Sequence, residues 1–335
     1  MALKILRAGV LTTVQDLGRS GYQRFGVPVS GAMDAYSLRI ANALVGNGSE
    51  AAGLELTLEG PAIEFDEDSL FAVCGADLAP RVADRPVPMF RPVWVRAGTR
   101  VEFGAARVGS RAYLAVAGGI DVAPVLGSRS TYLRANLGGL EGRALKRGDR
   151  LGVGVPEATL YPRLKAQALG SPGGMAAAQW AVRARAEKLQ RTPQTLRFVS
   201  GGYWETLPAE SRARFTGSEY RVGAASDRMG YRLEGAQIDS GARREVLSEA
   251  VAFGTIQLPP DGNPIVLMAD RQVTGGYPRL GEVASVDLGL AAQLKPGDRV
   301  RFERISLTQA QQLWMAQERA FAELCEALRG HVDNA

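Results

Sequence analysis

A chain of 335 residues with 46% hydrophobic and 22% charged residues can bury a core and is long enough for two domains. Its 40 basic and 35 acidic residues give a formal charge of +5, spread along the chain, which argues against a nucleic-acid-binding protein. No apolar stretch is long enough to span a membrane, and Lys4 and Arg7 interrupt the apolar start, so we expect neither an anchor nor a signal peptide.

The small numbers of cysteines and histidines limit the kinds of catalytic and metal sites that the chain can form. Cys74 and Cys325 are too few for a disulfide framework, so we expect a protein of the reducing cytoplasm. The single histidine, His331, follows a predicted helix end at Gly330 and is expected in a solvated tail. This excludes a Ser-His-Asp triad, a Cys-His pair and zinc sites that need imidazole, and we predict no metal site. Acid–base chemistry must then come from Asp, Glu, Lys, Arg, Tyr or water.

The predicted elements follow from periodicity. Residues 33–45 place apolar side chains on one side of a helix that ends at Gly46. Ser306 and Gln309 have the spacing of a capping box and predict a second helix over residues 306–330. Segment 156–193, rich in Ala, Arg and Gln, is interpreted as a partly helical connector. Short apolar runs between Gly, Pro and Asp predict antiparallel strands at residues 70–73, 92–95, 101–103, 112–116, 265–268 and 299–302.

An internal repeat relates the two halves of the chain. Residues 30–36 match 226–231, Glu55 matches Glu249, 71–77 match 265–270, and 98–101 match 297–300, at offsets of 193 to 199 residues. We therefore predict a mainly β fold with a few helices, made of two repeat-related antiparallel barrel domains. These are expected at residues 1–155 and 194–305, joined by the connector and followed by the last helix.

The first polar cluster lies in residues 11–34. Its glycines allow close backbone approach, and the start of the predicted helix favours anions. A substrate-binding role is therefore predicted for Asp16, Arg19, Gln23, Ser30 and Asp34. The alternative is that Ser30 or Asp34 caps the helix and the glycines form turns.

The second polar cluster lies in the second half of the chain. Asp270 follows an apolar run, which places it at a strand end beside a Gly-Gly loop, where ligands are often bound. Local polarity predicts one pocket with Asp227, Arg228, Glu249 and Asp270, together with Ser226, Gln257, Gln272, Thr274, Gly275 and Gly276. The alternative is a surface ion pair between Asp227 and Arg228 with a plain hairpin at the two glycines.

A third stretch, residues 127–136, has basic and hydroxyl groups suited to a phosphate: Ser128, Arg129, Ser130 and Asn136. A solvated turn explains the same residues. The sequence has no Walker phosphate-binding loop and no Met-Lys biotin-attachment dipeptide. Aspartates and arginines without imidazole indicate an enzyme that polarises carboxylate, amide or phosphate groups by charge placement.

These motifs carry a family resemblance. Residues 12–19, 26–34, 117–120, 126–131 and 226–235 resemble the family of allophanate hydrolase subunit 2, KipA and the C subunit of 5-oxoprolinase, which is related to the carboxyltransferase domain of urea carboxylase. The resemblance covers residues 3–302. It implies cyclophilin-like β-barrel domains and a KipI-like partner, which is the B subunit in 5-oxoprolinase. For 5-oxoprolinase it also implies a third, LamB/YcsF-like protein, the A subunit.

The resemblance also implies a reaction, the ATP-dependent opening of the 5-oxo-L-proline lactam to L-glutamate. Phosphorylation of the lactam oxygen, by ATP with Mg²⁺, would create a leaving group that water displaces, while arginines and loop amides hold the phosphate and the substrate carboxylate. Resemblance and polarity together assign catalysis to Asp227, Arg228, Glu249 and Asp270.

Two other functions remain open at this stage. Relatives within urea carboxylase pass a carboxyl group from biotin to urea, and a carboxyltransferase subunit that uses urea or a similar amide with a separate carrier is one alternative. A non-catalytic KipA-like regulator that binds a kinase inhibitor is the other. Because we find no biotin carrier or biotin carboxylase segment, a 5-oxoprolinase subunit without covalently bound biotin is favoured.

Overall fold

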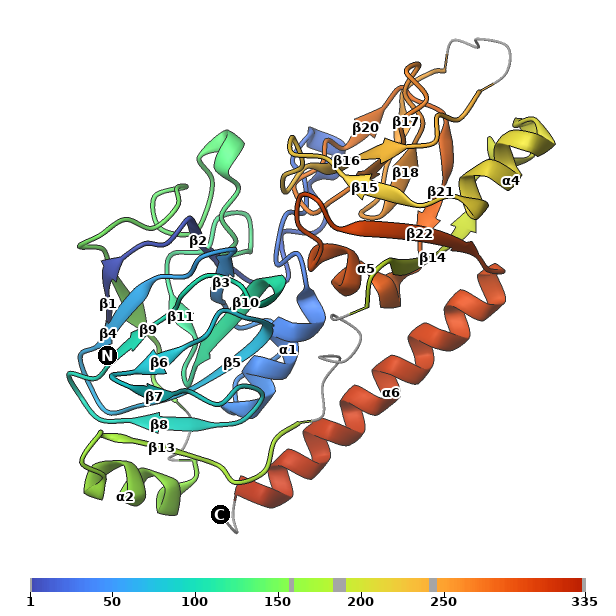
Figure 1. The fold of residues 1–335 in the computed structure, drawn as a ribbon. Coiled ribbons are helices and arrows are strands. Elements are labelled where there is room, and N and C mark those ends of the chain that lie inside the picture. Colours follow the sequence, from blue (N-terminus) through green and yellow to red (C-terminus); the bar gives the residue numbers. More distant parts are fainter. Residues whose placement is uncertain (1, 157–159, 183–190, 241–245, 333–335) are drawn as a thin grey trace. The chain divides into compact units, whose positions relative to one another are not determined.

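A computed structural model describes residues 2–156, 160–182, 191–240 and 246–332 (Figure 1). The chain forms two compact units. Unit 1 comprises Met1–Arg19, Asp34–Ala186 and Ala320–Ala335, and unit 2 comprises Ser20–Met33 and Glu187–Arg319. This division differs from the predicted linear domains, because Ser20–Met33 packs with the second half of the chain.

The strands of unit 1 form two antiparallel sheets (Figure 1). The seven-stranded sheet has the order β11 (Ile120–Asp121), β12 (Arg150–Val153), β1 (Ala2–Arg7), β4 (Ala62–Phe65), β9 (Arg100–Glu102), β6 (Arg81–Val82) and β7 (Arg85–Pro86). The six-stranded sheet has the order β13 (Met175–Ala177), β8 (Val93–Val95), β5 (Ser69–Asp77), β10 (Val108–Val116), β3 (Gly53–Thr57) and β2 (Leu11–Gln15).

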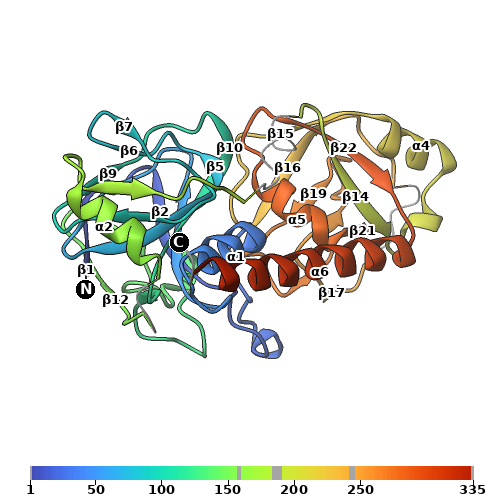
Figure 2. The same cartoon turned by 90° about the horizontal axis from the view of Figure 1, so that it is seen from below.

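Apolar residues of both sheets meet in one core, which includes Ile5, Phe65 and Phe71. A second cluster in unit 1 packs helix α1 (Ala35–Leu44) against the six-stranded sheet. The last turns of α6 (Leu307–Val332) lie beside α1 and join this cluster (Figure 2). The Phe321 ring is 6.1 Å from that of Tyr36. The predicted connector contributes α2 (Pro162–Gly170) and β13 to unit 1, so this part is integral to the unit.

Unit 2 is built on a closed barrel with the order β14 (Gln194–Ser200), β21 (Arg279–Val283), β18 (Thr255–Gln257), β19 (Ile265–Leu267), β16 (Gly230–Gly235), β15 (Tyr220–Val222) and β22 (Arg299–Arg304). Neighbouring strands are antiparallel except β14 and β22. A two-stranded ribbon, β17 (Glu249–Ala250) with β20 (Thr274–Gly275), accompanies the barrel. Helices α4 (Ala209–Gly217) and α5 (Ser285–Ala292) complete the unit, and its core contains Phe198, Phe215 and Phe302.

The predicted mainly β fold is confirmed, but a closed barrel is described only in unit 2. The first two repeat matches join unlike elements: residues 33–36 lead into helix α1, whereas 229–231 lead into strand β16. Glu55 lies within the central strand β3, whereas Glu249 begins the two-residue strand β17. Short identical motifs therefore occur in different local structures. The last match agrees, because Gly98 and Gly297 both take positive φ in a turn before a strand.

The capping box of the last helix is confirmed. Ser306 Oγ accepts a hydrogen bond from the Gln309 N–H at 3.1 Å, and Gln309 Oε1 accepts one from the Ser306 N–H at 2.9 Å. The predicted end at Gly330 is wrong, since α6 continues to Val332, and the side chain of His331 lies outside the described part of the chain. Within the described ranges, no helix is long and apolar enough to cross a membrane.

Candidate functional site

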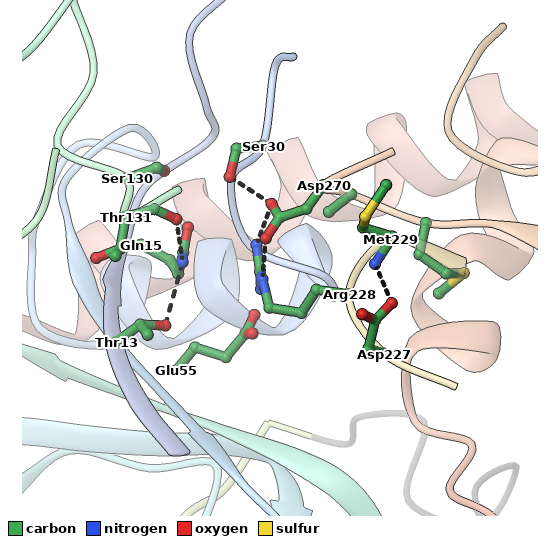
Figure 3. Close-up of polar contacts among 12 residues, drawn as sticks. Thr13, Gln15, Ser30, Glu55, Ser130, Thr131, Asp227, Arg228, Met229 and Asp270 are labelled. Carbon is green, nitrogen blue, oxygen red and sulfur yellow. Dashed lines mark hydrogen bonds and ion pairs between the residues drawn. The ribbon is translucent and has the colours of Figure 1, made fainter. Parts of the chain in front are cut away.

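A buried ion pair joins Arg228 and Asp270 in unit 2 (Figure 3). Arg228 Nε donates to Asp270 Oδ2 at 2.8 Å, and Nη2 donates to Oδ1 at 3.0 Å. The two residues are only 5% and 4% exposed. A guanidinium and a carboxylate held by two parallel hydrogen bonds form a strong and geometrically specific pair.

Backbone pairing fixes the two side chains beside each other. The Asp270 N–H donates to the Arg228 carbonyl at 2.8 Å, and the Met268 N–H donates to the Met229 carbonyl at 2.9 Å. These bonds extend the antiparallel pairing of β16 with β19 beyond the strand ends. The predicted position of Asp270 at a strand end is therefore confirmed.

The segment before α1 completes this arrangement within unit 2. Ser30 Oγ donates to Asp270 Oδ1 at 2.5 Å (Figure 3). Arg228 Nη2 donates to the Gly31 carbonyl at 2.7 Å. Ser30 has φ of 57°, a left-handed conformation that is costly for a residue with a Cβ atom. Such strain is often found at functional sites, where the surrounding contacts maintain it. The cluster of Ser30, Arg228 and Asp270 is our candidate site.

Asp227 and Ser226 do not join this cluster. Asp227 is exposed, and its Oδ1 accepts hydrogen bonds from the Met229 N–H at 2.8 Å and the Gly230 N–H at 3.3 Å (Figure 3). Ser226 Oγ accepts one from the Arg232 N–H at 3.1 Å. Both side chains stabilise the turn that leads into β16, which is the local role such residues commonly take.

A separate group forms where the ribbon lies against strands β18 and β21. Glu249 pairs with Arg279 at 3.6 Å between Oε1 and Nε, and Gln257 is 1% exposed and lies against Gly275. A Cβ atom at Gly275 would lie 2.3 Å from Gln257 Nε2, so only glycine allows this approach. Glu249 is thus placed with Gln257 and Gly275, not with Asp270, while Gln272, Thr274 and Gly276 are exposed.

Two charged residues that the sequence analysis missed, Arg271 and Glu282, lie beside this group. Thr255 Oγ1 donates its one proton to the Glu282 carboxylate, whose Oε1 and Oε2 lie 2.9 and 2.8 Å away. Burial raises the pKa of the Glu282 carboxyl, against the opposing effect of Thr255 and nearby arginines. Burial likewise lowers the pKa of the Arg271 guanidinium, which the charges of Glu282 and Asp270 partly offset. A carboxylate between the buried Leu280 and Val283 of β21 is a signal that could have identified Glu282.

In unit 1, Asp16 is the centre of a different arrangement. Its carboxylate accepts hydrogen bonds from the Gly18 N–H at 2.8 Å, the Arg129 N–H at 2.5 Å, Ser128 Oγ at 2.6 Å and Ser130 Oγ. The carboxylate therefore ties two loops together. The serine hydroxyls predicted to bind phosphate direct their protons at Asp16, so this segment does not fit a nucleotide phosphate in the present arrangement.

Other predicted residues of the first half also have local contacts. Buried Arg19 donates to the Ser130 carbonyl, and Gln23 Oε1 accepts from the Gly21 N–H at 3.1 Å. Asn136 is exposed, with φ of 51° at the end of a short 3-10 helix. Asp34 caps α1, because its carboxylate accepts hydrogen bonds from the N–H and Oγ of Ser37 at 3.1 and 2.7 Å. The capping alternative is therefore the one observed for Asp34.

A buried polar network in unit 1 was also missed. Tyr113 on β10 donates to Glu55 Oε2 at 2.7 Å and accepts from the Asp34 N–H at 2.7 Å. Arg111 Nε lies 3.9 Å from Glu55 Oε1. Burial, reinforced by the charges of Glu55 and Asp34, raises the pKa of the Tyr113 hydroxyl well above its usual value. The signal was Glu55 itself, an acidic residue inside the apolar strand β3.

Comparison with known proteins settles the family. The model of the carboxyltransferase domain, subdomains A and B, matches residues 25–304. The chain belongs to this family. It is 40% identical to the C subunit of 5-oxoprolinase from Escherichia coli over 99% of this chain and all of the relative. It is 36% identical to the Haemophilus influenzae protein of the same name, over 93% of this chain and 94% of the relative.

The chain is also similar to parts of larger enzymes. It superposes on the crystal structure of Kluyveromyces lactis urea carboxylase with a TM-score of 0.82 and 32% identity, covering 96% of this chain and 29% of that one. A urea amidolyase from Lachancea kluyveri is 37% identical over 96% of this chain and 18% of that protein. The predicted relation to a carboxyltransferase domain is thereby confirmed.

Proposed function

We propose that this chain is the C subunit of an ATP-dependent 5-oxoprolinase that hydrolyses 5-oxo-L-proline to L-glutamate. Its support is the full-length similarity, at 40% and 36% identity, to two proteins of that name. The sequence-based prediction of a 5-oxoprolinase subunit is confirmed by this similarity. Similarity to urea carboxylase supports an ancestry shared with enzymes that act on another small amide.

Within this proposal, Arg228 and Asp270 hold charge near the reacting lactam. When water adds to the phosphorylated lactam, negative charge moves onto the oxygens of the phosphate that then leaves, and a fixed cation beside them lowers the barrier. The buried pair is suited to this because Ser30, Gly31 and the strand ends already hold it in one geometry. Little reorganisation would then be needed during the reaction.

The proposal includes two partner proteins, a KipI-like B subunit and a LamB/YcsF-like A subunit, and a cytoplasmic location. ATP, with Mg²⁺, would supply the energy that opens the lactam. Because Ser128 and Ser130 are bonded to Asp16, we assign no phosphate-handling step to residues 128–136.

The test is reconstitution. The chain is co-expressed with the two candidate partners, and ADP release is measured with and without 5-oxo-L-proline. We expect 5-oxoproline-dependent ADP release from the assembled complex and none from the isolated chain. A complex that instead carboxylates urea from added carboxybiotin would establish the carboxyltransferase alternative, which the likeness to urea carboxylase favours as the second candidate.

A further inference from the structure

The contact region between the ribbon and the barrel contains a layer of six polar residues, all in unit 2. The cross-strand pairs of β18 and β21 place Thr255 opposite Glu282 and Gln257 opposite Arg279. The intervening Ile256 is in the apolar core, so these polar side chains project from the other face of the sheet. Strands β17 and β20 contribute to that face. We call this set the polar layer: Glu249, Thr255, Gln257, Arg271, Arg279 and Glu282.

Several atoms of the polar layer are buried without hydrogen-bond partners. Among the described residues, Gln257 Nε2 has no such partner, and Glu249 Oε1 and Arg279 Nε face each other as an ion pair at 3.6 Å, too far apart for a hydrogen bond. Gln257 is 1% exposed, so water outside the protein cannot satisfy its amide. Native proteins rarely leave buried polar atoms unpaired, so each such atom calls for an explanation, and a bound molecule is one of them.

Arg271 adds a poorly satisfied cation to the polar layer. Its guanidinium is buried and donates over long distances, 3.4 to 3.5 Å, to the carbonyls of Val251, Met268 and Ala269. These contacts lie at the limit of hydrogen-bonding distance. No carboxylate of the described residues forms an ion pair with it, although Glu282 lies near enough for its charge to act on it.

The unsatisfied atoms define the chemistry of a ligand. Arg271 and the Gln257 amide are donors that require oxygen acceptors. Arg279 Nε and Glu249 Oε1 form a long ion pair, and each could exchange it for a hydrogen bond, the first to an oxygen acceptor and the second to an N–H or O–H group of a ligand. Guanidinium groups match carboxylates in geometry as well as charge. We infer that the polar layer is a binding site for a small molecule bearing both a carboxylate and an amide N–H, the class to which 5-oxo-L-proline belongs.

This inference rests on the proposed function and deepens it by separating binding from catalysis. The candidate site and the polar layer contain consecutive residues. Asp270 pairs with Arg228, and the next residue, Arg271, belongs to the polar layer. Glu249, which the sequence analysis assigned to catalysis, becomes a substrate-binding residue. Gln257 keeps the binding role predicted for it.

The decisive variant is Gln257→Met, which preserves the length of the side chain and removes its polar atoms. Gln194→Met is the matched control, because Gln194 is also a buried barrel glutamine, and its Nε2 makes only a 3.4 Å contact with the Thr195 carbonyl among the described residues. In the assembled complex we expect Gln257→Met to raise the KM for 5-oxo-L-proline at least tenfold while kcat changes less than twofold. The control should keep both constants.

A ligand-dependent shift of the melting temperature gives a second readout on the isolated chain. Without ligand, Gln257→Met should melt at or above the wild-type temperature, because an unpaired buried donor has been removed. Addition of 5-oxo-L-proline should raise the melting temperature of the wild type and of Gln194→Met but not of Gln257→Met. If Gln257 had only a structural role, its replacement would not abolish the ligand-induced rise in melting temperature while leaving the stability without ligand intact.

The outcomes separate this inference from the proposed function. If the complex turns over 5-oxoproline and Gln257→Met leaves KM unchanged, the inference is wrong and the proposed function stands. If the wild-type complex shows no 5-oxoproline-dependent ADP release, the proposed function fails. The ligand-dependent shift of the melting temperature then tests whether the polar layer is a binding site. A shift with N-acetylglycine that Gln257→Met abolishes supports a carboxylate–amide site, whereas no difference between wild type and variant indicates a buried water and overturns the inference.

Discussion

Two arginine–aspartate pairs of nearly the same geometry lie in unit 2. Arg228 and Asp270 are joined by hydrogen bonds of 2.8 and 3.0 Å, and Arg197 and Asp287 by hydrogen bonds of 2.8 and 2.6 Å. Both aspartates are buried. The chemistry of the pair alone therefore does not distinguish a structural role from a functional one.

Their surroundings do distinguish them. Asp287 lies in the first turn of α5 and also accepts the backbone N–H of Arg197 at 2.9 Å, so this pair attaches α5 to β14. The Arg228–Asp270 pair lies where the pairing of β16 with β19 continues beyond the strand ends. It holds Ser30 in a left-handed conformation, at a cost in backbone energy. A pair that maintains backbone strain, as Arg228–Asp270 does, is a better candidate for function than a pair that only attaches a helix to a strand.

The largest effect is expected on stability, and it should be shared by both pairs. Arg228→Ala and Arg197→Ala each leave a buried aspartate without its cation, which should lower the free energy of unfolding by about 3–5 kcal/mol. Urea denaturation of the isolated chain measures this. If either variant kept the wild-type free energy of unfolding, its aspartate would have to be open to solvent, contrary to the structure.

Turnover should separate the pairs. Arg228→Lys keeps the charge but loses the two parallel hydrogen bonds, and we expect 5-oxoproline-dependent ADP release by the complex to fall about a hundredfold, or roughly 2–4 kcal/mol of barrier. Arg197→Lys is the matched control and should keep wild-type turnover at a temperature where both variants are folded. Equal losses in the two variants would make the Arg228–Asp270 pair structural.

Ser30 permits a finer test of strain against hydrogen bonding. Ser30→Ala loses the bond to Asp270 and keeps the unfavourable φ, so we expect a loss of about 1 kcal/mol in unfolding free energy. Ser30→Gly loses the same bond but relieves the φ, by roughly 1 kcal/mol, and should be the more stable of the two. Thermal denaturation ranks them. The opposite ranking would mean that the backbone at Ser30 is not strained.

The smallest effect concerns a third pair, Arg143 with Asp149, on the surface of unit 1. The hydrogen bond from Arg143 lowers the pKa of Asp149, so its stabilisation is present above the unfolded-state pKa and is lost as pH falls through the folded-state pKa. Asp149→Asn should cost about 0.5 kcal/mol at neutral pH, because solvent screens the pair. The difference from wild type should vanish well below pH ~3.9 in urea denaturation. A deficit that persists there would indicate lost packing instead of lost charge.

The sequence predicted those features that depend on neighbouring residues. The capping box at Ser306, the helix start at Asp34 and the strand-end position of Asp270 all follow from spacing over a few residues. The polar motif of residues 226–232 also placed Arg228 near a strand, although it grouped Asp227 and Glu249 with it. Asp227 bonds to its own turn, which was the simpler interpretation of a residue of that type.

Features that depend on distant contacts were not predictable in the same way. Whether Ser30 meets Asp270 or Glu249 meets Arg279 depends on the folding of the whole of unit 2, not on local spacing. Arg197 and Asp287 lie 90 residues apart and carry no motif that links them. Two of the four repeat matches join unlike local structures for the same reason, because the matched residues have different neighbours in α1 and β16 and in β3 and β17.

The composition of unit 2 has a consequence for synthesis on the ribosome. Ser30 and Asp270 are 240 residues apart, so at elongation rates of about 5–20 residues per second Ser30 waits roughly 12–48 s for its partner. During this time Ser20–Met33 remains without the rest of unit 2, and unit 1 still lacks Ala320–Ala335. The candidate site is therefore among the last parts of the nascent protein to form. A chain that terminates before residue 270 would therefore lack both Asp270 and the last segment of unit 1, so that neither the candidate site nor unit 1 is complete.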